Sequence, residues 1–157
     1  MYDAVVAVSA AGREAWISMR ELLMSGQGHD QFIAAVTGEG LTPGPAKALL
    51  RLQAEGSQPM RDLAQMLGCD ASYITALTDQ LEEKGFAERR PHPSDRRARI
   101  VVLTDAGEQA AARITEKMSV PPTSFGALSV AEQATLRDLM RKVAGAGQEA
   151  APTVRSA

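Results

Sequence analysis

Apolar side chains recur every three or four positions over most of the 157-residue chain, which is the spacing of amphipathic helices. A first helix is predicted over residues 3–24, and a shorter one over residues 30–36, where Asp30 is a capping candidate. Two further helices are predicted to begin at Pro43, which follows the cap candidate Thr42, and at Pro59. The second of these carries a complete apolar stripe, formed by Met60, Leu63, Ala64 and Leu67.

A tight turn follows this stripe and leads directly into another helix. In the turn "LGCD" at residues 67–70, the glycine suits a helix end and Asp70 is an N-cap candidate. The next helix is predicted from Asp70 to Lys84, and its inward face is formed by Ile74, Leu77 and Leu81. Two short helices joined in this way predict a helix-turn-helix.

Two strand-like runs come next, "FAERR" at residues 86–90 and "RARIVVL" at residues 97–103. The segment between them, "PHPSD", contains two prolines, which exclude a helix there. The runs therefore predict a β-hairpin that has a basic tip and is anchored in the core by its apolar end. Helix, turn, helix and basic hairpin make a winged helix, so the predicted fold is mainly α with a small β-hairpin wing.

Charge is unevenly distributed, although the net charge of the whole chain is only −2. Residues 84–99 hold six basic side chains and two acidic ones, a net charge of +4, which leaves −6 for the remainder. A basic patch on an acidic body favours an anionic partner. A run of charged residues is usually a solvated loop. Next to a predicted winged helix, the alternative is a surface that binds double-stranded DNA.

Two helical regions remain beyond the wing. One begins at Thr104 or Asp105 and ends near Met118, and the other begins at a capping box formed by Ser129 and Glu132. The last helix carries an apolar stripe formed by Leu136, Leu139, Met140 and Val143.

These stripes need a partner, either the chain's own domain or a second copy. We favour a second copy, because a two-fold dimer doubles the contacts of a DNA-binding protein. The expected organisation is an N-terminal dimerisation helix and connector at residues 1–40, a winged helix-turn-helix region at 41–104, C-terminal dimerisation helices at 105–145 and a disordered tail at 146–157.

Several other classes of protein lack support in the sequence. The single cysteine, Cys69, excludes an intrachain disulfide and fits a reducing cytoplasm. The opening "MYDAVVAVSAAG" has neither the basic start of a signal peptide nor the length of a membrane helix. Catalytic triads, paired catalytic carboxylates, phosphate-binding loops and metal-ligand spacings are absent from the sequence. We therefore expect a cytoplasmic protein that is not an enzyme and holds no cofactor or metal.

The run "DRRARIVVLT" at residues 95–104 fits the wing signature D-x-R-x-x-x-x-x-L-T of the MarR (multiple antibiotic resistance regulator) family, which the chain resembles. The segments "LTPGPAKALLRL", "MRDLAQMLGCDASYITALTDQLEEKGFAERR", "LTDAGEQ" and "LSVAEQATLRDLM" also look like that family. The resemblance covers residues from 41 to 143. It implies a homodimeric winged-helix transcription regulator, usually a repressor, that binds an inverted repeat and is released by a small, often aromatic or phenolic, effector.

By position in the family, the helix from Asp70 to Lys84 is the recognition helix, and Arg97 reaches the minor groove or its phosphates, held by Asp95. Family members often carry arginine at the position of Ala76 and a basic residue at that of Gln80. Because this chain lacks both basic side chains, its recognition of the base sequence relies more on other residues or on DNA shape. The candidate DNA-binding residues are Ser72, Tyr73, Thr75, Ala76, Asp79, Arg89, Arg90, His92, Asp95, Arg96 and Arg97. The candidate effector-binding residues are Trp16, Met19, Arg20 and Met24.

Some of these residues have a second interpretation. Tyr73 either contacts DNA or covers a helix end, with equal support. Ser72 and Thr75 suit phosphate contacts better than base contacts, because most such hydrogen bonds go to the DNA backbone. Cys69 lies at a helix N-terminus, where a thiolate is favoured, yet a small buried apolar role is commoner for such a cysteine than redox sensing. The other alternative is a winged helix that binds only protein, which would not require so many arginines.

Overall fold

The computed structural model describes residues 8–24, 26–92, 94 and 98–149. Within this part the chain forms two compact units, one up to Val120 and one from Pro121 onward. The first unit comprises α1 (Ala10–Met24), α2 (Gln27–Gly38), α3 (Pro43–Glu55), β1 (Gln58–Pro59), α4 (Met60–Leu67), α5 (Ala71–Glu83), β2 (Ala87–Pro91), β3 (Arg99–Leu103) and α6 (Asp105–Met118). The second unit comprises the short 3₁₀ helix η1 (Thr123–Ala127) and α7 (Val130–Glu149).

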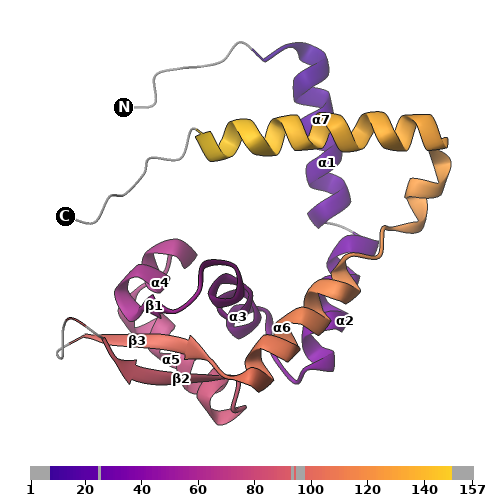
Figure 1. Ribbon diagram of the computed structural model, residues 1–157. Coiled ribbons are helices and arrows are strands. Elements are labelled where there is room, and N and C mark those ends of the chain that lie inside the picture. Colours follow the sequence, from indigo (N-terminus) through magenta and orange to yellow (C-terminus); the bar gives the residue numbers. More distant parts are fainter. Residues whose placement is uncertain (1–7, 25, 93, 95–97, 150–157) are drawn as a thin grey trace. The chain divides into compact units, whose positions relative to one another are not determined.

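Three short strands form an antiparallel sheet in the order β1-β3-β2 (Figure 1). β2 and β3 pair from Ala87 opposite Leu103 to Pro91 opposite Arg99, which is the predicted wing hairpin. β1 adds a third strand on the other edge of β3. The sequence analysis missed β1, because two residues, one of them proline, carry no alternating pattern. The predicted fold class, mainly helical with a small β wing, is confirmed.

One apolar core joins the helix-turn-helix to the sheet and to α6. All positions predicted to face inward on α4 and α5 are buried or pack against this core. Fully burying one such leucine or isoleucine contributes about 1.5–3 kcal/mol to folding. The largest fully buried apolar side chains include Leu49 and Leu52 of α3, Leu63 of α4, Ile74 and Leu81 of α5, Val101 of β3 and Ile114 of α6.

The end of α5, the end of the wing and the start of α6 meet at Thr104. The Thr104 hydroxyl donates to the carbonyl of Gly85 at 2.6 Å and accepts from the amide of Gly107 at 3.1 Å, so Thr104 caps α6. The Thr104 amide donates to the carbonyl of Phe86 at 3.1 Å. A Cβ atom on Gly107 would lie 1.9 Å from that carbonyl oxygen, so only glycine fits where α6 passes Phe86.

A nearly buried carboxylate holds the end of α2 to α6, and the two helices lie side by side (Figure 1). The Glu39 side chain is 9% exposed and accepts from the Arg113 guanidinium at 3.0 and 2.7 Å, with Lys117 Nζ at 3.9 Å. The hydrogen bonds from Arg113 hold the pKa of the Glu39 carboxyl below its ordinary value of 4.5. Gln31 adds hydrogen bonds from its side-chain amide to the carbonyls of Lys117 and Val120.

Three predicted helix starts were wrong. The helix expected to begin at Pro59 begins at Met60, because Pro59 belongs to strand β1. α1 begins at Ala10, later than predicted, because the Ser9 hydroxyl caps it by accepting from the amide of Gly12 at 3.1 Å. The first seven residues lie outside the described part of the chain. α2 begins at Gln27, so Asp30 lies in its first turn instead of capping it.

The second unit contains the predicted capping box. The amide of Ser129 donates to the Glu132 carboxylate at 2.8 Å, and the amide of Glu132 donates back to the Ser129 hydroxyl at 3.4 Å. Bonds from the Ser129 hydroxyl and amide lower the pKa of the Glu132 carboxyl. α7 then continues to Glu149, so the expectation of disorder was wrong for residues 146–149: small residues alone do not end a helix, and the next proline comes later. Residues 150–157 lie outside the described part.

Gly107→Ala should destabilise the protein, because the added methyl group overlaps the carbonyl oxygen of Phe86. Relieving such overlap in a packed site costs about 1–3 kcal/mol. Gly145→Ala in α7 is the matched control, since among the described residues nothing outside its own helix lies within 4 Å of its Cβ position. Alanine there should be neutral or stabilising by up to about 1 kcal/mol. Urea denaturation measures both, and an unchanged midpoint for Gly107→Ala would contradict the close crossing.

Glu39→Gln should lower the free energy of unfolding at neutral pH by about 1–2 kcal/mol, because Arg113 loses a charged acceptor. Folding lowers the pKa of Glu39, so its contribution is present above the ordinary value of 4.5 and is lost as the pH falls through the lower folded-state pKa. The parent and the variant should therefore converge in stability below pH 4.5. Glu116→Gln, on an exposed position of α6, is the control. Thermal unfolding across the acidic range tests this, and a difference that does not change with pH would contradict it.

Candidate nucleic-acid interface

Helix α5 begins at a strong local cap. Gly68 takes the left-handed conformation that ends α4, with φ of 62°, and the Asp70 carboxylate then accepts from the amide of Tyr73 at 2.8 Å. The Ser72 hydroxyl donates to the same oxygen at 2.6 Å. These bonds, first the one from Ser72, hold the pKa of the Asp70 carboxyl below its usual value. The turn therefore fixes where α5 starts and which face it exposes.

The predicted DNA-reading residues of α5 all lie on its exposed face. Two of their hydroxyls already have acceptors, because Ser72 donates to Asp70 and Thr75 donates to the carbonyl of Ala71 at 2.8 Å. A hydroxyl in this state still offers lone pairs to a donor such as a base amino group. A phosphate only accepts, so a phosphate contact requires the hydroxyl to turn away from its present partner. The exposed residues are Ser72, Tyr73, Thr75, Ala76 and Asp79.

The Tyr73 side chain packs against the start of α3. A Cβ atom on Gly44 would lie 2.8 Å from the Tyr73 hydroxyl oxygen, so the hydroxyl end of the side chain lies against that glycine. The residue is nevertheless 52% exposed. The side chain of Tyr73 therefore packs against the start of α3, and both its contact with DNA and its role in covering a helix end stay predictions.

The wing carries the other candidate residues. Arg90 has a side chain that is 58% exposed and pairs with Glu88 of the same strand, and Arg99 is exposed at the start of β3. The amide of His92 donates to the carbonyl of Ala98 at 3.0 Å, which continues the pairing of the two wing strands beyond their ends. Asp95, Arg96 and Arg97 lie outside the described residues, so their roles stay predictions.

Arg89 differs from its neighbour Arg90 in what it contacts. Its side chain is only 23% exposed, and it bonds to the carboxylates of Asp79, at 2.7 Å, and of Glu82 on α5. Two residues predicted to bind DNA, Arg89 and Asp79, are therefore partners of each other in this structure. The sequence analysis missed Glu82, although its spacing of three residues from Asp79 brings both acids to one side of the helix.

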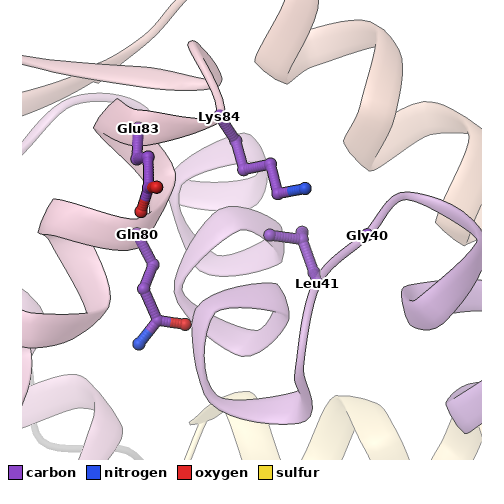
Figure 2. A pocket seen from close by; sticks show the side chains of 5 residues that line it. All are labelled: Gly40, Leu41, Gln80, Glu83 and Lys84. Atoms are coloured by element: carbon purple, nitrogen blue, oxygen red, sulfur yellow. The ribbon is translucent and has the colours of Figure 1, made fainter.

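Two pockets adjoin α5. The first, of about 250 Å³, lies between the α2–α3 connection and the second half of α5. Figure 2 shows Lys84 extending toward Gly40 and Leu41, with Gln80 and Glu83 on the helix wall. The second, of about 520 Å³, is mostly apolar and lies between α4 and α5; it is lined by Met60, Arg61, Ala64, Gln65, Cys69, Ala71, Ile74 and Thr75.

The candidate effector-binding residues lie away from both pockets, on α1. Trp16 and Met24 are 60% and 73% exposed, Arg20 is exposed and Met19 is half-buried. Across the described ranges there is no group of three or more side chains that suits a metal ion. The helices in the same ranges are too short or too polar for any of them to cross a membrane.

Known proteins resemble this chain both in sequence and in fold. The family model described as MarR family matches residues 41–98. A relative from Thauera aromatica, named as a transcriptional regulatory protein for the hcr operon, is 35% identical over 127 residues, which are 80% of this chain and 76% of that protein. The multiple antibiotic resistance protein MarR of Salmonella typhimurium is 32% identical over 101 residues, which are 62% of this chain and 69% of that protein. The crystal structure of wild-type MarR from Escherichia coli matches with a TM-score of 0.65 at 21% identity, over 87% of this chain and 97% of that one.

The Thauera aromatica relative is named as a regulatory protein rather than an enzyme, as the sequence led us to expect for this chain, and the Escherichia coli structure shares the fold of this chain. The family match begins at Leu41, where the winged helix-turn-helix region was predicted to start, and it includes the capped helix α5 and strand β2. The chain belongs to the MarR family of DNA-binding transcriptional regulators.

Proposed function

We propose that this chain is a homodimeric repressor that binds an inverted-repeat operator by sequence and is released by a small molecule. The observation that carries the proposal is that the exposed face of α5 and the arginine-bearing strand β2 are held together in one packed unit. A recognition helix and an adjacent basic wing can enter neighbouring grooves of one duplex at the same time.

In this proposal α5 lies in the major groove and the wing lies at the adjacent minor groove. Ala76 and Gln80 stand where long basic side chains would reach base edges, so a large part of the sequence preference comes from DNA shape. The hydroxyls of α5 supply the remaining polar contacts, and the arginines of the wing supply phosphate contacts. The residues at the DNA are Ser72, Thr75, Ala76, Arg90, Arg96 and Arg97.

The dimer is supported by apolar side chains that both chain ends leave exposed. None of the 15 residues of α1 is buried, and Trp16 and Leu23 are 60% and 62% exposed. On α7, Leu139 and Val143 are 56% and 63% exposed. Exposed apolar stripes of this kind favour association. A second copy covers them and sets two α5 helices about 34 Å apart, the spacing of half-sites one helical turn apart.

Release requires an effector that binds the DNA-free arrangement more tightly than the DNA-bound one. The apolar pocket between α4 and α5 includes Thr75, so an aromatic or phenolic molecule seated there competes with operator contacts. Cys69 packs against the core, which fits a structural role better than redox sensing. The basic wing argues against a winged helix that binds only protein.

Leu139→Glu should shift the protein from dimer to monomer, because it introduces a charge into the apolar stripe of α7. Arg141→Glu is the control, since it also introduces a glutamate, with an even larger change of charge, but on the opposite face of the same helix. Analytical ultracentrifugation at micromolar concentration measures the effect. A parent chain that sediments as a monomer under these conditions would overturn the proposed dimer.

Arg97→Ala should weaken binding to the operator and to random DNA alike, because a phosphate contact is insensitive to sequence. The slope of log affinity against log salt should flatten by about one unit. Thr75→Ala should instead weaken operator binding more than random binding. Arg137→Ala, which removes the same charge from α7, is the control. Fluorescence anisotropy at several salt concentrations, with DNA from upstream of the protein's own gene and a random duplex, measures these effects.

Asp95→Ala, measured in the same assay, distinguishes a positioned arginine from a merely basic loop. If Asp95 holds Arg97 in place, its loss weakens binding although a negative charge is removed. Tighter binding by Asp95→Ala would exclude the positioned arginine, and unchanged binding by Arg97→Ala would exclude the wing contact. A parent chain with no preference for any duplex, including those selected from a randomised library, would refute the sequence-specific function.

A further inference from the structure

The Arg89 side chain connects the wing to the recognition helix at several points. Its guanidinium donates to the Asp79 carboxylate at 2.7 Å, to the backbone carbonyl of Thr75 at 3.1 Å and to the Glu82 carboxylate. Its backbone amide donates to Glu82 Oε1 at 2.8 Å. Residues 75–82 span about two turns of α5. One strand residue is thus bound along half of α5, and its contacts include Thr75, which the proposed function places at the DNA.

The charges of this cluster do not attract DNA. One guanidinium faces two carboxylates, so the three side chains carry a net charge of −1 at the edge of the recognition helix. Asp79 is 59% exposed on the face assigned to DNA, where phosphates repel a carboxylate. A favourable contribution of the cluster to DNA binding therefore has to come from geometry rather than from charge.

We propose that Arg89 is a positioning residue, which together with Asp79 and Glu82 forms a clamp that fixes the wing relative to the recognition helix before DNA arrives. The inference rests on the proposed operator binding. If α5 and the wing contact two grooves of one duplex, the distance between them has to be fixed in the complex. A protein in which this distance is already fixed loses less conformational entropy when it binds DNA. A guanidinium suits this task, because its rigid fork of N–H groups bonds several acceptors at once.

The opposing assignment is that Arg89 leaves the two acids and contacts a phosphate when DNA binds. The two assignments predict opposite signs for Asp79→Asn. With the clamp, Asp79→Asn weakens operator binding about tenfold although it removes a negative charge, because the wing loses its fixed position. With the phosphate contact, the same variant binds more tightly. Glu83→Gln is the matched control, because Glu83 is an exposed acid next to Glu82 but outside the clamp, and its binding should be unchanged or slightly tighter.

Variants of Arg89 itself separate its charge from its shape. Arg89→Lys keeps the charge but loses the fork, so the clamp predicts about tenfold weaker operator binding and a smaller preference for operator over random DNA. Arg89→Met should weaken operator binding to a similar extent and leave the salt slope unchanged, because no phosphate contact is lost. Full binding by Arg89→Lys, or a slope that flattens by about one unit in Arg89→Met, would overturn the proposal in favour of a phosphate contact.

A measurement without DNA tests whether the clamp exists in solution. Urea unfolding of Arg89→Met, Asp79→Asn and the double variant should show a coupling of about fivefold in the unfolding constant. Additive single effects would overturn the clamp, whatever the DNA measurements give. If the variants show coupling but the parent chain prefers no operator, the proposed function is refuted, and with it the positioning role. Arg89 and Asp79 would still be shown to interact. The two failures are therefore distinguishable.

Discussion

Backbone pairing on both edges of β3 is the constraint on which the winged helix-turn-helix region depends. β1 leads directly into α4, and β2 follows the end of α5 after a short turn, so the pairing of both strands with β3 closes the chain around the helix pair. β3 then leads into α6 through Thr104, whose hydroxyl bonds back to Gly85 at the end of α5. α5, the wing and α6 therefore cannot shift against one another without breaking these backbone and side-chain hydrogen bonds.

Much of this arrangement could be predicted, because its determinants are local. The left-handed Gly68, the cap formed by Asp70 and the capping box of α7 each depend on residues within four positions of one another, and all three are confirmed. The inward positions of α4 and α5 follow from helical periodicity alone. These features decide where α5 and α7 begin and which face α4 and α5 bury, so the fold class and the exposed face of α5 follow from sequence.

The features that could not be predicted depend on residues that are distant in sequence. β1 is a strand only because Gln58 and Pro59 lie opposite the middle of β3, and two residues cannot show a period. Gly107 is required because α6 passes Phe86, which no helical pattern reveals. In the candidate site, the acids that bind Arg89 come from the preceding helix, so the sequence of the wing gives no sign of them.

The two neighbouring arginines of β2 show why a count of charges is insufficient for the site. Successive side chains of a strand point to opposite faces, so Arg89 reaches α5 while the side chain of Arg90 stays largely in solvent. The net charge of +4 over residues 84–99 omits Asp79 and Glu82, which lie outside that range in sequence but form ion pairs with Arg89. Including these two acids lowers the net charge of the patch from +4 to +2. The positive charge of Arg89 is thus offset by two carboxylates, and the remaining net charge of the patch comes from its other basic residues.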